Sequence, residues 1–201
     1  LMDRLVEEVD RLAYLRGTSR SNLINQLLAE SLSLVTPEKR MQEMFSHMQS
    51  TINALDGLAV CLQPSDSRLS IKSSLRYKYN PTIRYHLVLY REPTDVFGEL
   101  RVFFRTQNPS LLARLTDFFV FWCQLERKVQ NRSIAYEVSP GKLVRPLALP
   151  KSPTPEMLAD ATTQYIALFD AALKQYFESP THTSEIVGQY LNYVNQNSIV
   201  V

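Results

Sequence analysis

The spacing of the apolar residues changes near residue 64, and this change limits the chain to folds that combine helices with a sheet. Before it, apolar residues recur every three or four positions, as on one face of a helix. After it, the segments RLSIKSSLRYKY, TIRYHLVLYR and ELRVFFRT alternate apolar and polar residues, as half-buried strands do. We therefore expect an α+β protein with a helical N-terminal part and a C-terminal part built around a sheet.

The rest of the chain is predicted to complete the sheet and to cover it with helices. Residues 109–129 and 155–178 have helical spacing, and a short amphipathic helix is expected over residues 184–195. SIAYEV and KLVRPLAL predict one or two further strands around a Pro-Gly turn. The sequence thus predicts a mostly antiparallel sheet of four to five strands packed by helices, in a chain divided into residues 1–35, a connecting helix over 36–63, and an α+β domain over 64–201.

A long third helix is predicted to begin at Pro37, since proline suits the first turn of a helix. Its apolar residues form a seam with steps of three and four that continues to residue 62, flanked by a second column: Met41, Met44, Met48, Thr51, Leu55, Leu58 and Leu62, with Phe45, Ile52 and Ala59. Packing into the chain's own core and pairing of helices across a dimer both fit this pattern.

The stretch LRGTSRSNLINQLL is predicted to form a corner between two helices. The first helix, over residues 3–16, is amphipathic, and Gly17 can adopt the positive φ that commonly ends a helix. Ser19 is a good N-cap for a second helix, and Asn22 lies three positions later, where a capping box has Glu or Gln. Most corners of this kind only pack two helices together, so the residues around it decide whether it has a function.

The N-terminal segment LMDRLVEEVDRLAYLRGTSRSNLINQLLAESL resembles the ribbon–helix–helix family of bacterial DNA-binding proteins. An amphipathic helix, a short basic stretch with glycine, and Ser-Arg-Ser opening a second helix carry the resemblance. In that family a β-strand precedes the first helix and pairs with its copy from a second subunit to enter the major groove. Leu1 stands where this strand would end, so we expect the residues that read bases to precede it in the full-length protein; the alternative is that this chain has lost that function.

The resemblance implies a phosphate-binding corner, formed by Thr18, Ser19, Arg20 and Ser21 at the start of the second helix. Unpaired backbone N–H groups and the helix dipole favour an anion there, and such contacts position a protein on DNA without reading its sequence. The alternative is that Ser19 only caps the helix and Arg20 is solvated. Net charge does not decide between them, because residues 1–40 contain six basic and six acidic residues.

Basic residues gather on the predicted strands instead. Residues 66–105 contain eight Lys or Arg and four Asp or Glu, a local net charge of +4. Strand alternation places several of them, with aromatic residues between, on the side opposite the apolar face; the candidate ligand or partner residues are Arg76, Lys78, Arg84, His86, Arg101 and Arg105. Such a face can hold single-stranded nucleic acid, an anionic small ligand or a protein partner. It can equally be the solvated face of an antiparallel sheet.

The sequence contains no arrangement typical of an enzyme. His47, His86 and His182 are far apart and lack metal-ligand spacing with Cys61 or Cys123, and no glycine-rich phosphate loop is present. We therefore expect no catalytic residues, no metal and no cofactor. Two cysteines without paired spacing predict buried free thiols in a reducing compartment, and the longest apolar run is too short to span a membrane.

Taken together, these observations predict a cytoplasmic, nucleoid-associated transcriptional regulator that binds double-stranded DNA as a homodimer or higher homo-oligomer. The C-terminal domain would then serve as an effector or oligomerisation domain. Two other interpretations remain open at this point. One is an accessory DNA-binding protein of plasmid transfer or partition whose C-terminal domain recruits a protein. The other is an interaction module whose N-terminal helices only dimerise.

Overall fold

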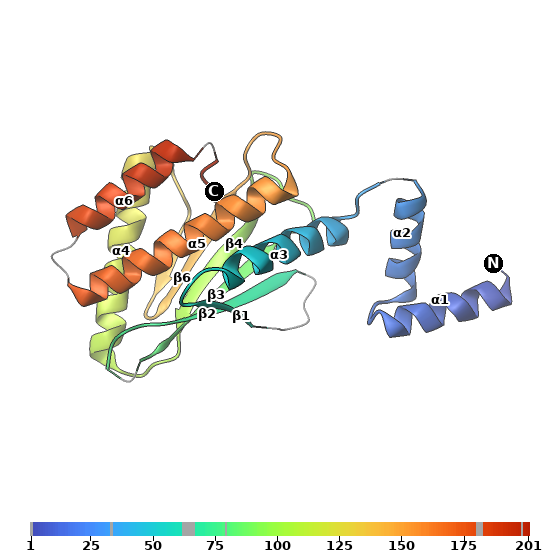
Figure 1. The fold of residues 1–201 in the computed structure, drawn as a ribbon, viewed down its shortest axis with the longest axis horizontal. Coiled ribbons are helices and arrows are strands. Elements are labelled where there is room, and N and C mark those ends of the chain that lie inside the picture. Colours follow the sequence, from blue (N-terminus) through green and yellow to red (C-terminus); the bar gives the residue numbers. More distant parts are fainter. Residues whose placement is uncertain (1, 33, 62–66, 79, 180–182, 198) are drawn as a thin grey trace. The chain divides into compact units, whose positions relative to one another are not determined.

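The computed structural model describes residues 2–32, 34–61, 67–78, 80–179, 183–197 and 199–201 (Figure 1). The chain divides into two compact units, Leu1–Arg40 and Met41–Val201. The predicted α+β class is confirmed, since helices α1 to α6 accompany a six-stranded sheet. Leu1, the residues around Pro64, and His182 lie outside the described residues.

The first unit contains the two helices predicted at the corner, α1 (Asp3–Leu15) and α2 (Arg20–Ser31). They pack through a small cluster in which Val9, Ala13 and Leu23 are buried, with Leu12 and Ile24 partly buried against them. Leu23 is the most deeply buried residue of this cluster, because none of its surface is exposed. The two helices thus share very few buried side chains.

Helix α3 (Pro37–Asn53) begins where predicted but ends well before residue 62, so that part of the prediction is wrong. Gly57 adopts a φ of 84°, which turns the chain, and Leu58–Cys61 then forms strand β1 against β2. Met41, Met44 and Met48 of the seam and Ile52 of the flanking column are buried in the core of the second unit. This half of the seam therefore packs into the chain's own core, and its continuation to Leu58 was a coincidence of spacing.

The described strands of the second unit form one antiparallel sheet in the order β1-β2-β3-β4-β6-β5. Besides β1, they are β2 (Arg68–Ser74), β3 (Thr82–Leu89), β4 (Val96–Phe104), β5 (Glu137–Ser139) and β6 (Lys142–Ala148). The sheet has one strand more than the highest predicted number, because β1 is built from residues assigned to the helix. The predicted strand over SIAYEV shrinks to its last residues, since Ile134 and Tyr136 pack inward instead.

Helices α4 (Pro109–Gln130), α5 (Pro155–Glu178) and α6 (Thr183–Gln196) form where helices were predicted. Local signals explain two of their starting points. The side chain of Asn108 accepts a hydrogen bond from the backbone N–H of Leu111, and that of Thr154 accepts one from Met157, at 3.2 and 3.3 Å. Proline follows each cap at the first helical position, where its missing N–H costs nothing.

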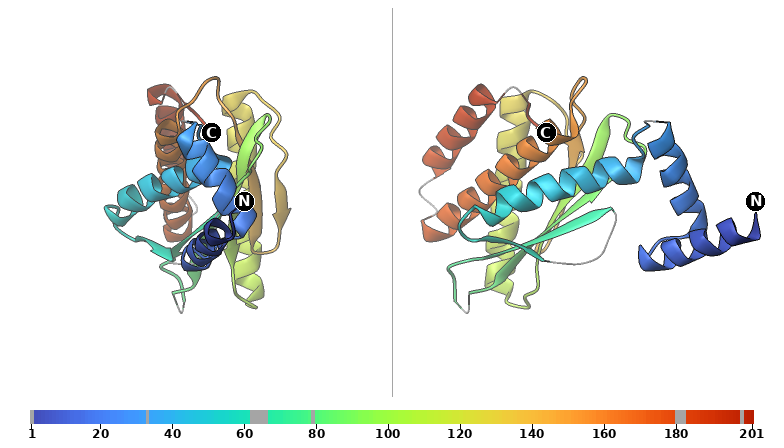
Figure 2. Two further views of the ribbon diagram at one scale, coloured as in Figure 1. Left: turned by 90° about the vertical axis from the view of Figure 1, so that its right-hand side faces the viewer. Right: turned by 45° about the vertical axis from the view of Figure 1, so that its right-hand side comes forward.

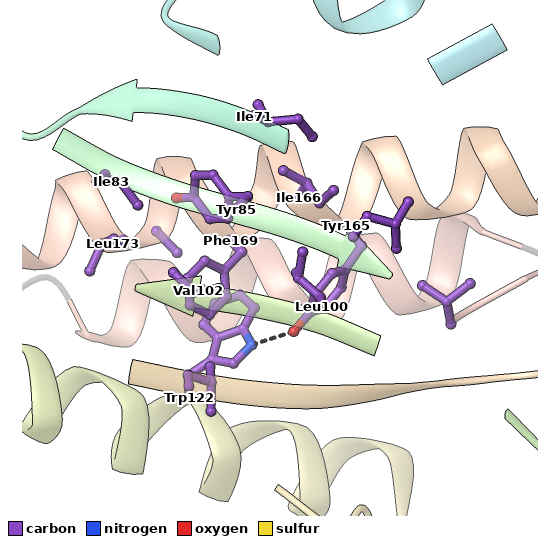
Figure 3. Close-up of a cluster of buried hydrophobic side chains, with 14 of the residues drawn as sticks. Ile71, Ile83, Tyr85, Leu100, Val102, Trp122, Tyr165, Ile166, Phe169 and Leu173 are labelled. Atoms are coloured by element: carbon purple, nitrogen blue, oxygen red, sulfur yellow. Dashed lines mark hydrogen bonds between the residues drawn. The ribbon is translucent and has the colours of Figure 1, made fainter. Parts of the chain in front are cut away.

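The core lies between the sheet and these helices (Figures 1 and 3). Ile83, Tyr85, Leu87 and Leu89 of β3 all point into it, as their alternation predicted. Tyr85 meets Phe169 of α5 edge to face, and Phe169 also contacts Trp122 of α4. Among the described residues of the second unit, no helix covers the opposite face of the sheet (Figure 2).

Candidate functional site

The corner between α1 and α2 is built by local backbone hydrogen bonds. Gly17, with a φ of 62°, donates its N–H to Tyr14, and Thr18 donates to Ala13, which is the Schellman arrangement that closes many helices. Ser19 then caps α2, because its hydroxyl oxygen accepts from the N–H of Asn22 at 3.3 Å. The predicted stop, turn and cap are therefore confirmed in their positions.

The start of α2 retains the features of an anion site. No carbonyl inside the helix can accept from the N–H groups of its first turn. Among the described residues, the hydroxyl of Ser19 accepts from Asn22 and its backbone carbonyl accepts from Leu23, which leaves the N–H groups of Arg20 and Ser21 at the helix end for an anion. The first turn contains no acidic residue to oppose an anion there. The N–H of Thr18, by contrast, is already used within the corner.

Arg20 does not extend freely from this corner, because it forms an ion pair with Asp10 of α1. The guanidinium nitrogens Nε and Nη2 donate to the two carboxylate oxygens of Asp10. These hydrogen bonds and the charge of Asp10 raise the pKa of Arg20 above its usual value. Both side chains are about half exposed, so solvent screens the pair and a phosphate can compete for Arg20. Residue spacing could not reveal this partner, which lies ten residues earlier on the other helix.

Most of the exposed large apolar side chains among the described residues lie in the first unit. Of the fourteen described large apolar side chains that are exposed, nine lie between residues 2 and 35: Met2, Leu5, Tyr14, Leu15, Leu27, Leu28, Leu32, Leu34 and Val35. Exposed apolar residues scattered singly are ordinary, whereas here nine lie on and beside two short helices.

The basic residues predicted on the sheet fall into two groups. Arg84 and His86 lie on β3 beside Phe103 and Arg101 of β4, on the face that no helix covers. Arg105 directly follows β4 and is exposed. Arg76 and Lys78 follow the end of β2 and lie outside the strands, so they are not part of the regular face. The strand pattern missed three further exposed cations of this face: Lys142 on β6, with Lys72 and Arg68 on β2.

His86 lies near the middle of the uncovered face. Its ring meets that of Phe103 edge to face, with the ring centres 4.6 Å apart. Partial burial lowers the pKa of His86, and four neighbouring arginines lower it further: Arg68, Arg84, Arg101 and Arg105. The face therefore has a positive electrostatic potential. Glu99 offsets it in part, because it accepts from Nε of Arg101 at 2.6 Å.

The most completely buried charged groups lie elsewhere, and no pattern in the sequence pointed to them. Arg145 of β6 donates from Nε and Nη2 to Glu126 of α4 at 3.0–3.2 Å, and both side chains are almost inaccessible to solvent. Although burial alone would lower it, the pKa of Arg145 is raised by the Glu126 carboxylate. Hydroxyl groups of Tyr136, Tyr165 and Tyr190 also donate to Glu126.

This buried cluster is best described as structural. It joins helices α4, α5 and α6 to strand β6 and to the segment before β5. Nη2 of Arg145 also donates to the backbone oxygen of Val201 at 2.5 Å. Trp122 donates to the hydroxyl of Tyr165 at 2.9 Å, as the dashed line in Figure 3 marks. A second buried carboxylate, Asp170, accepts from Tyr85 and Ser73. The groups named here form hydrogen bonds with one another, so they hold helices and strands of the second unit together.

Among the residues that the structure describes, no group of three His, Cys, Asp or Glu side chains is placed to hold a metal ion. His47 instead bonds Asp160 at 2.7 Å and joins α3 to α5. The two cysteines are free, and burial raises the pKa of Cys123 to about 12, whereas Cys61 is only half-buried, contrary to the prediction. No described helix is both long and apolar enough to cross a lipid bilayer.

No model of a known protein family matches the chain, and neither a curated protein nor a solved structure matches it.

Proposed function

We propose that the protein is a transcriptional regulator that binds double-stranded DNA sequence-specifically as a dimer, through a ribbon–helix–helix module that contains α1 and α2. The second unit would serve as its effector or oligomerisation domain. The observation that carries this proposal is the imbalance within the first unit. Three buried side chains, Val9, Ala13 and Leu23, stand against nine exposed large apolar ones.

A unit of this size cannot be stable on so small a core. Below about 40 residues a chain usually needs a disulfide, a metal or a partner chain to fold. A second copy of the same two helices meets this need, because a two-fold arrangement buries the same apolar patch on both subunits. In a ribbon–helix–helix dimer the helices of two chains form one shared core, which fits helices that expose leucines on several sides.

The corner would then clamp a DNA phosphate on each subunit. The N–H groups of Arg20 and Ser21 supply two donors, and the helix dipole adds a partial positive charge. Arg20 must leave Asp10, or share it, to reach the phosphate. Because the ion pair is exposed and solvent-screened, this exchange has a small energetic cost.

Replacing Arg20 by Ala is expected to weaken binding to all duplex sequences alike, because phosphate contacts carry no sequence information. The dependence of log K on log salt should become shallower by about 0.9 for each phosphate that the variant no longer neutralises. Asp10→Asn should have the opposite effect on affinity, since it releases Arg20 from its ion pair. Fluorescence anisotropy at several salt concentrations measures both changes.

Arg11→Ala is the matched control, because Arg11 is also an exposed arginine of the first unit in an ion pair, with Glu8. It should leave the salt dependence of binding unchanged. If Arg20→Ala also left it unchanged, the phosphate clamp would be wrong, even if the protein binds DNA.

Selection from a pool of random duplexes tests the proposed function itself. The full-length protein, with any residues that precede Leu1, is expected to enrich sites with two-fold symmetric or tandem half-sites, because a symmetric dimer reads each half in the same way. A pool that stays unenriched after several rounds would contradict sequence-specific recognition.

A further inference from the structure

The uncovered face of the sheet has a composition that the proposed regulator does not require. The cationic and aromatic residues of the described strands that point away from the helices form what we call the basic face. Arg105, which directly follows β4, is included in it. Its members are Arg68, Lys72, Arg84, His86, Arg101, Phe103, Arg105 and Lys142. The acidic residues beside them on this face are Glu99 and Glu137.

The register of the sheet places these residues in rows across the strands. Lys72 lies opposite Arg84, Arg84 opposite Phe103, and Phe103 opposite Lys142, so one row carries three cations around an aromatic ring. In the next row His86 is paired with Arg101. Neighbouring strands are about 4.8 Å apart, so a row over four strands is about 14 Å long. This is a surface for an extended chain rather than for a small ion.

We propose that the basic face binds a single-stranded polynucleotide, with its cations on the phosphates and Phe103 against a base. The positive potential fits a polyanion, and two half-buried rings lie in the middle of the cations. Only a single strand offers the faces of its bases to such a ring, since a duplex hides them in its stack. An acidic peptide would use the cations but would leave the ring without a specific partner.

The structure around His86 supports the same conclusion. Four arginines near one imidazole repel one another, and Glu99 is the acidic side chain that accepts a hydrogen bond from one of them. Like charges are costly to hold together unless an anion relieves them. A phosphodiester chain supplies several negative charges at regular intervals, which suits cations spread over β2, β3, β4 and β6.

The test is the binding of fluorescent oligo(dT) and oligo(U) to the full chain, measured by anisotropy over a range of salt concentrations. The variant Lys72→Glu with Arg105→Glu changes two exposed cations of the basic face. It is expected to bind more than tenfold more weakly, with a salt slope shallower by about 1.4, because each single-strand phosphate contact contributes about 0.7. Phe103→Leu is expected to bind about tenfold more weakly at an unchanged salt slope.

The matched control is Lys128→Glu with Lys151→Glu, which makes the same change in charge at exposed positions outside the face. Circular dichroism shows whether each variant is folded, and Lys72→Glu alone serves if the double variant is not. Binding of either oligonucleotide that only the face variants weaken supports the proposal, and a preference between the two reflects the sugar or the methyl group of thymine, the two features in which they differ.

Two results would overturn it. In the first, the face variants bind oligonucleotides as the control does. In the second, a poly-glutamate peptide of the same length and charge binds as tightly, which would show that charge alone is recognised. Duplex binding through α1 and α2 is measured separately, so either proposal can fail without the other.

Discussion

Replacing Glu126 by Gln is expected to lower the free energy of unfolding by about 3–5 kcal/mol, the range for breaking a buried ion pair by removing one charge. Arg145 would remain buried and charged, with 1 % of its side chain exposed and without the Glu126 carboxylate that now balances it. Three tyrosine hydroxyls would also lose a charged acceptor, and a hydrogen bond to a charged group is worth more than one to a neutral group.

Trp122 is a suitable probe for this measurement, because it is the chain's single tryptophan and is bonded to Tyr165 within the same cluster. Urea denaturation followed by its fluorescence should show a lower midpoint at an unchanged slope. Glu137→Gln, at an exposed position, is the control and should change stability by less than about 0.5 kcal/mol. A decrease below about 1 kcal/mol for Glu126→Gln would show that the cluster tolerates an unpaired arginine.

Removing both charges separates the cost of an unpaired ion from the value of the pair. The double variant Glu126→Leu with Arg145→Met leaves no charge in this cluster, and such replacements are often neutral or stabilising in other proteins. We expect it to be more stable than Glu126→Gln. If it were less stable, the hydrogen bonds to the tyrosines and to Val201 would carry most of the stabilisation.

The double variant Leu5→Lys with Leu28→Lys is expected to turn the protein into a monomer and to abolish duplex DNA binding. Each leucine is about half exposed in the single chain, so a dimer has about half of each side chain left to bury. At about 1.5–3 kcal/mol for a fully buried leucine, the four leucines of a dimer account for about 3–6 kcal/mol. The dimer should therefore be about 100- to 20,000-fold weaker.

Sedimentation equilibrium measures this change, and Leu191→Lys is the matched control. Leu191 is 41 % exposed on α6 of the second unit, so the same substitution there should leave both the dimer and DNA binding intact. A variant at Leu5 and Leu28 that stays dimeric would place the subunit interface outside α1 and α2, and the proposed module would be wrong.

Much of the fold followed from local patterns. The corner at Gly17 and Ser19 and the starts of α4 and α5 depend on side chains within a few residues of the backbone groups they serve, so sequence spacing contains the necessary information. Strand β1 did not follow from the sequence. Leu58 fits the helical seam and the strand equally well, and pairing with Ser73, fifteen residues later, decides between them.

In the candidate site, too, the local contacts were predictable from the sequence and the contacts between distant residues were not. Ser19 caps its helix as predicted, but the partner of Arg20 lies on the other helix and appears only when the corner is folded. No spacing rule reveals Glu126 and Arg145, because the hydrogen bonds that Glu126 makes with Arg145 and with the three tyrosines join residues 10 to 64 positions apart along the chain. Alternation did identify the uncovered side of β3 and β4, although it could not show which cations of β2 and β6 lie beside them.

The most direct test of the proposed DNA-binding function is a salt titration of duplex binding by the full-length protein, including any residues that precede Leu1. We expect micromolar or tighter binding at low salt, with a slope of log K against log salt of about −5 or steeper, as about six or more phosphate contacts require. Absence of binding, or affinity that does not change with salt, would contradict this function and would leave the corner between α1 and α2 as packing alone.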